Sequence, residues 1–171
     1  MRLEDHIATV PDFPVEGILF RDITPLVGHP GAFREALDRM AEPWRGAGVD
    51  MVASVEARGF IFGAPLAGML GAGFVPVRKE GHLPRGTHSA RYTLEYRSDV
   101  LYIHDDAIRE GQRVLIVDDL IATGGTAKAV VDLVRELRGE VAGLGFLVEL
   151  SGLDGRGLLE GLTVHSVMKF E

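Results

Sequence analysis

RVLIVDDLIATGGTAKAVVDLV, residues 113–134, contains a run of apolar residues that ends in two adjacent aspartates. A short loop with two glycines between two threonines follows, and then a helical pattern of apolar residues. A continuous apolar run is typical of a strand that is buried on both faces of a parallel sheet. The stretch therefore predicts a buried strand, a loop and an amphipathic helix, in that order along the chain.

The residues on either side continue this alternation of strand and helix. Their patterns predict a short helix over residues 151–161 and longer helices over residues 29–48, 60–73 and 126–139, the last closed by Gly139. After an irregular start and apart from extended segments over residues 92–108, they predict strands within residues 50–59, 73–81, 113–119, 141–150 and 162–170. This order indicates an α/β fold with a mainly parallel sheet flanked by helices. Because no repeat or linker interrupts the 171 residues, we expect a single domain, residues 1–171.

The composition narrows the classes of function. Hydrophobic residues make up 46% of the chain and charged residues 25%, as in a globular protein, and no apolar run is long enough to span a membrane. The net charge of −7 argues against general nucleic-acid binding, which needs a basic surface. The chain has no cysteine, which excludes disulfides, thiolate metal sites and a cysteine nucleophile. With no export signal in the first 17 residues, we expect a cytoplasmic protein without a membrane or nucleic-acid partner.

Polar clusters follow three of the predicted strands. In open parallel sheets, ligands bind beyond the carboxyl ends of the strands. The clusters at those ends are Glu56 with Arg58 and Gly59, Arg78 with Lys79, and the polar stretch from Asp118 to Thr126. We therefore expect these residues to line one site.

The loop of Ala122, Thr123, Gly124, Gly125 and Thr126 has the chemistry of an anion site. Unpaired N–H groups and the dipole at a helix start attract a phosphate, and the glycines let the backbone approach it closely. The loop has neither the lysine of a Walker loop nor a Gly-x-Gly-x-x-Gly pattern. The adjacent carboxylates can each accept a hydrogen bond from a ribose hydroxyl, which suggests a sugar phosphate as the ligand. Taken alone, such acids and glycines are also typical of turns and helix caps.

The complete string, an apolar strand followed by Asp-Asp, two residues and Ala-Thr-Gly-Gly-Thr, resembles the 5-phosphoribosyl-1-pyrophosphate (PRPP) motif of the type I phosphoribosyltransferases. The resemblance extends over the chain and favours the branch of the family that acts on adenine. It rests on FPVEGILFRDITPL (residues 13–26), ARGFIFGAPLA (57–67), VPVRKEGHLP (75–84), YTLEYRSD (92–99) and LVELSGLDGR (147–156).

This resemblance implies a fold and an activity. The fold is the type I phosphoribosyltransferase fold, a mainly parallel twisted sheet flanked by helices, with a small N-terminal hood that binds the base and a mobile lid loop. The activity is purine salvage, in which the 5-phosphoribosyl group moves from PRPP to adenine and AMP and pyrophosphate form. The resemblance also implies a homodimer and Mg²⁺, which is held mainly by PRPP and water with no protein ligand.

The resemblance assigns roles around the sugar. Asp118 and Asp119 bind ribose, and residues 122–126 bind the 5′-phosphate. Arg58 and Lys79 bind pyrophosphate, and Arg58 also takes part in catalysis by stabilising the leaving group. Arg78 is a weaker candidate. The resemblance further places a cis peptide bond at Glu56–Ala57.

A second group of roles concerns the base and the proton. Glu95 is the catalytic residue that handles the proton of the attacking nitrogen, and Tyr96 closes over the site with it. Residues 80–92 form a lid that excludes water. The residues that bind adenine are Leu19, Phe20, Arg21 and Leu150, with Ala122 as a further apolar wall. Without the resemblance, the sequence is equally consistent with Phe20 as a residue of the hydrophobic core. A glutamate in an extended segment, such as Glu95, is most often solvated.

Two positions depart from the family pattern. His82 stands where a lysine is common, and Arg97 stands where a glycine is common. A neutral histidine is a weaker partner for an anion than a lysine, so the role of His82 stays open between a pH-sensitive contact and a plain loop residue.

Other functions are also consistent with parts of the sequence. The alternatives are a phosphoribosyltransferase for hypoxanthine, guanine or xanthine, and a non-catalytic regulator that senses PRPP. Such a regulator carries a DNA-binding module, for which the residues before Phe13 are too few and too acidic. A receiver domain is excluded because its acidic pair follows the first strand.

Overall fold

The computed structural model describes residues 1–94 and 97–171. The chain forms two compact units, Met1–Arg39 and Met40–Glu171. No helix among the described residues has the length and hydropathy needed to cross a membrane.

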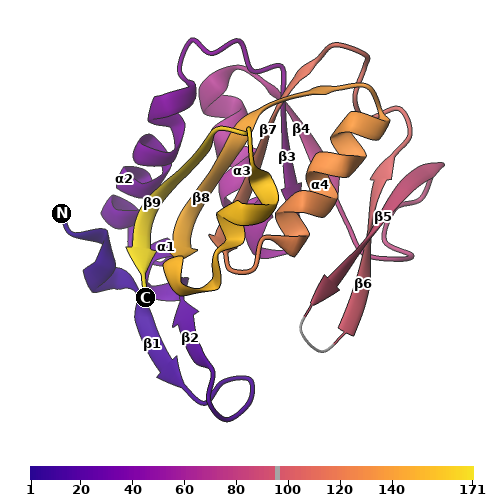
Figure 1. The fold of residues 1–171 in the computed structure, drawn as a ribbon. Coiled ribbons are helices and arrows are strands. Elements are labelled where there is room, and N and C mark those ends of the chain that lie inside the picture. The colour runs from indigo at the N-terminus through magenta and orange to yellow at the C-terminus, as the bar shows by residue number, and fades with distance from the viewer. Residues whose placement is uncertain (95–96) are drawn as a thin grey trace. The chain divides into compact units, whose positions relative to one another are not determined.

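The unit Met1–Arg39 contains a short antiparallel hairpin. The 3-10 helix η1 (Leu3–His6) precedes strands β1 (Ala8–Pro11) and β2 (Leu19–Asp22), which pair with Ala8 opposite Asp22 (Figure 1). Helix α1 (Thr24–Val27) follows, and helix α2 (Pro30–Ala41) begins in this unit. The sequence predicted an irregular start, which is wrong, because four-residue strands give too short a pattern to recognise.

The unit Met40–Glu171 is built on a five-stranded sheet in which every pair is parallel. Its order is β4-β3-β7-β8-β9, with β7 in the middle (Figure 1). The strands are β3 (Met51–Val55), β4 (Gly73–Val77), β7 (Arg113–Ile121), β8 (Glu140–Leu150) and β9 (Val164–Phe170). The predicted α/β class with a mainly parallel sheet is confirmed.

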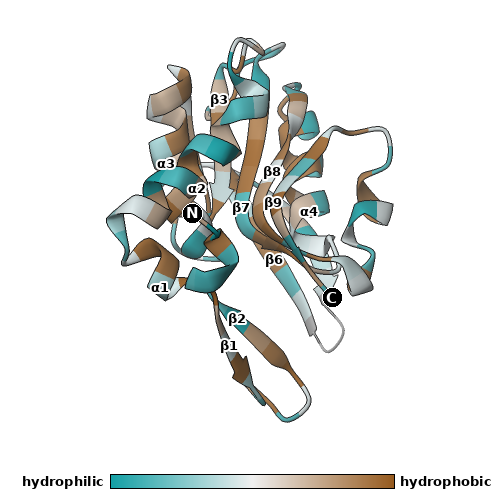
Figure 2. Ribbon diagram, turned by 90° about the vertical axis from the view of Figure 1, so that its left-hand side faces the viewer, coloured by the Kyte–Doolittle hydropathy of each residue, from teal (hydrophilic) through white to brown (hydrophobic). Residues whose placement is uncertain are grey.

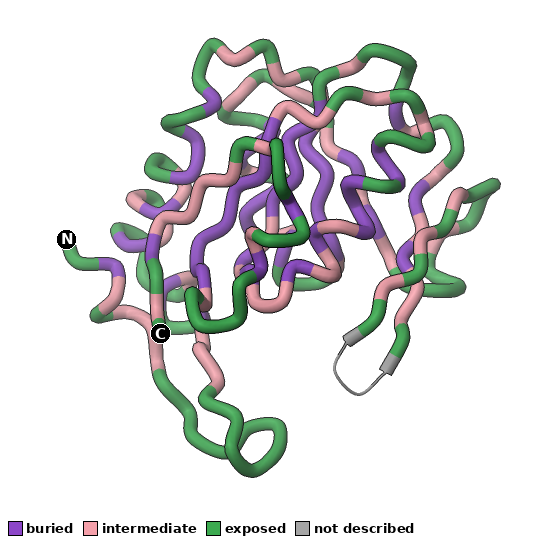
Figure 3. The backbone as a smooth tube through the Cα atoms, viewed as in Figure 1, coloured by how far each residue is buried: buried purple, intermediate pink, exposed green. Residues whose placement is uncertain are grey.

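Two helices cover opposite faces of this sheet. Ala53 and Val55 of β3 share a buried core with Val130 of helix α4 (Gly125–Glu136). Ser54, which points to the other face, lies against Gly63 of helix α3 (Arg58–Leu70), because successive side chains alternate across a strand. Figure 2 shows the apolar character of the central strands, and Figure 3 shows that they are buried along most of their length.

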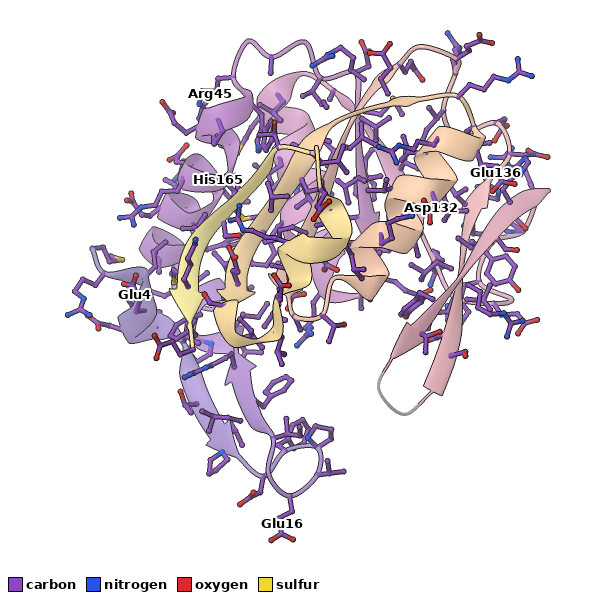
Figure 4. All side chains as sticks on the ribbon, in the orientation of Figure 1. Glu4, Glu16, Arg45, Asp132, Glu136 and His165 are labelled. Atoms are coloured by element: carbon purple, nitrogen blue, oxygen red, sulfur yellow. The ribbon has the colours of Figure 1, made fainter. Side chains whose placement is uncertain are left out.

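A second antiparallel hairpin packs beside α4. It consists of β5 (Thr87–Leu94) and β6 (Arg97–His104) (Figure 1). Glu136, labelled on α4 in Figure 4, pairs with His88 of β5 at 2.9 Å between Oε1 and Nδ1. Residues 87–92, predicted to be the second half of a lid loop, are therefore strand, and the loop between β4 and β5 ends at Gly86.

Three predicted helix boundaries are wrong, each for a local reason. Helix α2 ends at Ala41, ahead of the 3-10 helix η2 (Glu42–Trp44), because Pro43 cannot donate a backbone hydrogen bond. Helix α4 ends at Glu136, and the left-handed residue after it is Arg138 (φ 61°), not Gly139. The glycine-rich segment after β8 forms two 3-10 helices, η3 (Ser151–Leu153) and η4 (Gly155–Leu159), in place of one helix.

Candidate active site

The three polar clusters predicted from the sequence lie at one edge of the sheet. They follow β3, β4 and β7, which are neighbours in the order β4-β3-β7, and all three strands run in the same direction. The cluster after β7 is adjacent to the one after β3, which is adjacent to the one after β4. The structure therefore brings the three clusters together at the edge of the sheet where ligands bind in open parallel sheets.

A cavity of about 180 Å³ lies at the end of β7. It brings together Arg58, both aspartates and the whole predicted phosphate loop, although Arg58 is 60 positions or more from the others in sequence order. Lys79 does not line it. The residues around the cavity are Arg58, Asp118, Asp119, Leu120, Ile121, Ala122, Thr123, Gly124, Gly125, Thr126, Ala127 and Phe146.

The phosphate loop ends at the first turn of α4. Gly124 is the N-cap residue and has a φ of 84°, a backbone conformation that suits glycine. The first intrahelical bond runs from the N–H of Lys128 to the carbonyl of Gly124 at 2.9 Å. No side chain caps the helix start, so the N–H groups ahead of Lys128 face the cavity end of the helix without a capping group. This is the arrangement that binds a phosphate.

The acidic pair is held in close and partly buried surroundings. Asp119 is only 3% exposed, and its Oδ2 lies 3.0 Å from Nε of Arg58 at the start of α3. Asp118 accepts a hydrogen bond from the backbone N–H of Asp119 at 2.9 Å. Burial, and next to it the charge of Asp119, raises the pKa of Asp118 well above its usual value. Hydroxyl groups of a ligand that donate hydrogen bonds to these oxygens would offset the repulsion between the two carboxylates.

Glycine at position 59 makes room for one of these carboxylates. A Cβ atom there would lie 2.9 Å from Oδ1 of Asp118 and 3.5 Å from Cβ of Ser54. Larger residues at the start of α3 would therefore displace the Asp118 carboxylate.

Glu56 joins the loop after β3 to the loop after β4. Its Oε1 accepts a hydrogen bond from the backbone N–H of Lys79 at 2.7 Å and lies 3.3 Å from Nε of Arg78. Nδ1 of His82 is 2.7 Å from the same oxygen. Burial raises the pKa of Glu56, but the contacts with Lys79, His82 and Arg78 outweigh it and hold the pKa below its usual value. The sequence placed Glu56 at the strand end but gave it no role, because its partners come from another strand.

The peptide bond between Glu56 and Ala57 is cis, as the resemblance implied. It precedes Arg58, the first residue of α3.

The basic side chains after β4 already have acidic partners within the protein. Nζ of Lys79 lies 3.7 Å from Oδ2 of Asp99 on β6, and Arg78 donates a hydrogen bond to the carbonyl of His82 at 3.1 Å. His82 faces the carboxylate of Glu56. An anion that binds here therefore competes with these contacts within the protein.

The β5–β6 hairpin reaches the phosphate loop. The carbonyl oxygen of Thr93 on β5 would be 3.3 Å from a Cβ atom at Gly125. The predictions for Glu95 and Tyr96 lie outside the described residues, and the side chain of Arg97 is likewise not described.

The residues predicted to bind adenine are divided between the two units. Leu19, Phe20 and Arg21 lie on β2 in Met1–Arg39, where Leu19 is 48% exposed. The rings of Phe20 and Phe13 meet edge to face at 5.1 Å. Leu150 is the last residue of β8 in Met40–Glu171.

Two further groups at this edge had no sequence signal. Phe146 of β8 lines the cavity, but in the sequence it is one apolar residue within a buried strand. Gly155 contacts Gly124 and Ala122 of the phosphate loop, which are 31 and 33 positions away in the sequence, and this contact depends on the packing of η4 against α4.

Comparison with known proteins gives the family. Residues 32–157 match the family described as Phosphoribosyl transferase domain. An adenine phosphoribosyltransferase of Francisella tularensis subsp. tularensis is 54% identical over 170 residues, which cover 98% of this chain and 97% of the relative. One of Rhodopirellula baltica is 52% identical over 99% of this chain and 82% of its own length.

Solved structures agree with this match. The crystal structure of adenine phosphoribosyltransferase from Thermoanaerobacter pseudethanolicus has a TM-score of 0.95 and 52% identity, over 99% of this chain and 100% of that one. The enzyme of Saccharomyces cerevisiae, solved with adenine and an imino-altritol bisphosphate, has a TM-score of 0.92 and 41% identity, over 96% of each chain. The chain therefore belongs to the phosphoribosyltransferase family and, within it, to the adenine phosphoribosyltransferases.

Proposed function

We propose that this protein transfers the 5-phosphoribosyl group from PRPP to adenine and releases AMP and pyrophosphate. The observation that carries the proposal is the cavity at the end of β7, where two partly buried carboxylates lie beside an uncapped helix start. A sugar with neighbouring hydroxyls and a phosphate matches both halves of this cavity. The adenine phosphoribosyltransferases of similar sequence support adenine as the acceptor.

The ribose and its 5′-phosphate occupy the cavity in the proposed complex. Asp118 and Asp119 accept hydrogen bonds from the ribose hydroxyls. The 5′-phosphate binds the N–H groups and threonine hydroxyls of Ala122, Thr123, Gly124, Gly125 and Thr126. This orientation holds the anomeric carbon away from the phosphate loop, toward the ends of β3 and β4.

The pyrophosphate group binds near the ends of β3 and β4. Arg58 and Lys79 neutralise its charge as the bond to the anomeric carbon breaks, which makes Arg58 part of the catalytic apparatus. Arg58 releases part of its contact with Asp119 to do this, and Lys79 releases Asp99.

Magnesium enters with PRPP in this proposal. Among the described residues, no group of three or more His, Asp or Glu side chains is placed to hold a metal ion. We assign its coordination mainly to the oxygens of PRPP and to water. When bound, Mg²⁺ supplies positive charge that stabilises the leaving pyrophosphate.

Adenine binds between apolar groups, and its proton needs an acceptor. We assign the base contacts to Leu19, Phe20, Arg21 and Leu150, and the proton to Glu95, with Tyr96 closing the site. The structure of the Saccharomyces cerevisiae enzyme with adenine supports a base pocket in this family. The whole chain, residues 1–171, acts as one phosphoribosyltransferase domain in a cytoplasmic homodimer.

A panel of bases tests the function. The protein is incubated with PRPP and Mg²⁺ and with adenine, hypoxanthine, guanine or xanthine in separate reactions, and the nucleotide and pyrophosphate are quantified. We expect AMP from adenine, with kcat/KM higher than for the other bases by at least about a hundredfold, because a site that pairs with a base amino group rejects an oxo group.

The same panel separates the alternatives. Nucleotide from another base and none from adenine would assign a different purine. Tight binding of PRPP without turnover of any base would make the protein a PRPP sensor.

A further inference from the structure

The ion pair of Glu149 and Arg156 lies next in the chain to a residue that contacts the phosphate loop, and it takes no part in the proposed chemistry. Arg156 donates two hydrogen bonds to Glu149, from Nε to Oε1 and from Nη2 to Oε2, each at 2.7 Å. A third runs from Nη1 to the carbonyl of Val164 at 3.0 Å, and Nη2 lies 3.4 Å from Oγ of Ser166. Glu149 is 7% exposed. This bidentate geometry fixes Arg156 in one orientation against β8 and β9.

The pKa of Glu149 reflects its contacts with Arg156. Hydrogen bonds from Arg156 lower the pKa of Glu149 to about 2 despite its burial, with further help from Ser166 and the charge of Lys169. Nζ of Lys169 lies 3.9 Å from Oε2 of Glu149. The Glu149 side chain is buried, whereas that of Arg156 is 39% exposed. Desolvation of the carboxylate offsets part of the attraction, so the pair is better suited to specify one local geometry than to add net stability.

The residue before Arg156 is in direct contact with the phosphate loop. Gly155 is buried, and a Cβ atom on it would lie 2.4 Å from the carbonyl oxygen of Ala122. In return, a Cβ atom on Gly124 would lie 2.3 Å from the carbonyl oxygen of Gly155. The two segments approach backbone to backbone, so a shift of Gly155 moves the loop.

These contacts form a chain from the ion pair to the ligand site. Arg156 is fixed by Glu149, Gly155 is bonded to Arg156, and Gly155 supports Ala122 and Gly124 from behind. The loop itself has no side-chain cap on α4 to hold it. Its conformation therefore depends on the turn that carries Gly155.

We propose that Glu149 and Arg156 are positioning residues for the 5′-phosphate, which hold Gly155 against the loop of residues 122–126. The proposal rests on the proposed function, because it assigns the loop to the 5′-phosphate of PRPP. Neither side chain lines the cavity, so the effect on the ligand is indirect.

Binding of two different ligands distinguishes this role from a loss of stability. The variants are Glu149→Gln and Arg156→Met, with Glu110→Gln as the control, because Glu110 forms an exposed ion pair with Arg138 at 3.1 Å. Dissociation constants for ribose 5-phosphate and for pyrophosphate are measured by calorimetry, at a temperature where melting curves show each variant folded. Steady-state assays give KM for PRPP and kcat.

The affinity for ribose 5-phosphate should fall, whereas the affinity for pyrophosphate should not change. We expect the Kd for ribose 5-phosphate to rise about tenfold in both variants, because displaced binding groups commonly cost this much, while the Kd for pyrophosphate stays within about twofold. The double variant should lose no more than either single one, because both changes break one pair. Glu110→Gln should match the wild type.

Other outcomes overturn the proposal. An unchanged Kd for ribose 5-phosphate in a folded variant would remove Glu149 and Arg156 from the site. Equal weakening of both ligands would make the pair a general structural element. If Arg156→Met fails to fold, Arg156→Lys, which keeps the charge without the planar fork, gives the same comparison. A wild-type protein that binds no ribose 5-phosphate and uses no PRPP would instead contradict the proposed function.

Discussion

At the scale of single residues, the two aspartates carry opposite energetic roles. Asp119 gains an ion pair with Arg58, whereas Asp118 is partly buried beside a second carboxylate. A carboxyl group whose pKa is raised by folding destabilises the folded state when it is ionised. Ionised Asp118 therefore lowers the free energy of unfolding, as is common for residues that serve ligand binding at the expense of stability.

The substitution Asp118→Asn tests this directly. Because the pKa of Asp118 is raised in the folded state, its ionised form destabilises the protein above that pKa, and the effect vanishes below the unfolded value of about 3.9. We expect the unliganded variant to be more stable at pH 8 by about 1 kcal/mol, or ~2–4 °C in melting temperature, and this gain to shrink toward pH 4. Melting curves between pH 8 and pH 4 measure it.

The same variant should bind its substrate less well. KM for PRPP should rise by about tenfold or more, because a hydrogen bond to a charged acceptor is lost. Asp119→Asn is the matched control: it removes the ion pair with Arg58 and should lower the melting temperature. A gain in stability that does not depend on pH would mean that burial of charge is not the cause.

How far a residue's role could be predicted depends on where its partners lie in the sequence. Asp118, Asp119 and residues 122–126 form one contiguous string, and the cavity brings them together with Arg58. Glu56 was not predicted because its partners, Lys79 and His82, reach it only through the pairing of β3 with β4. Phe146 and Gly155 have neither a charge nor a motif that marks them.

At the scale of elements, the start of α4 sets the shape of the site. Gly124 has a left-handed backbone conformation and lies close to Gly155, and each of these two features excludes a side chain at this position. Only the strand, the loop and the helix were predictable here, because the contact with η4 is not local.

The substitution Gly124→Ala should therefore disturb both the fold and the site. We expect a loss of stability of about 1–3 kcal/mol, since alanine at a φ of 84° is strained and its Cβ would lie 2.3 Å from the Gly155 oxygen. KM for PRPP should rise with it. Gly152→Ala is the control, because a Cβ atom there meets nothing within 4 Å. Equal melting temperatures and KM values for the two variants would contradict the assigned role of Gly124.

The types of the long elements were predictable, and their ends were less so. Apolar patterns located β3, β7, β8 and α4, because each buries residues in the core. Helix α3 was predicted from its small residues, which suit close packing against a sheet. The end of α4 was wrong because Arg138 adopts the left-handed conformation that the pattern assigned to Gly139. Residues 87–92 of β5 were assigned to a lid because this part of the chain is mostly polar, and they pair with β6 in a separate two-stranded sheet.

At the scale of the whole molecule, sheet topology predicted the position of more candidate site residues than any single motif did. Parallel strands placed three clusters at one edge although the clusters begin 22 to 62 positions apart, and the expectation needed only the parallel arrangement of the strands. The division into Met1–Arg39 and Met40–Glu171 was not predicted, because no linker composition marks residue 39.

Ligand binding should stabilise the folded chain as a whole. Ribose 5-phosphate at a hundredfold excess over its Kd adds about 2.7 kcal/mol to the free energy of unfolding, which corresponds to roughly 5–10 °C for a protein of this size. Scanning calorimetry with and without the ligand measures the shift, and ribose without phosphate is the control. A shift as large with ribose alone would mean that the loop of residues 122–126 does not bind the phosphate.

Two adjacent, partly buried carboxylates also discriminate between sugars. In the proposed complex each carboxylate of Asp118 and Asp119 has one hydroxyl partner, so a 2-deoxy sugar would leave one of the two carboxylates without the hydrogen bond that the ligand donates. A site built to pair with a hydroxyl rejects the analogue that lacks it, by factors that reach about ten-thousandfold. The acidic pair would thus direct salvaged bases into the precursors of RNA and of adenylate metabolism, and exclude deoxyribose at the step where the glycosidic bond is made.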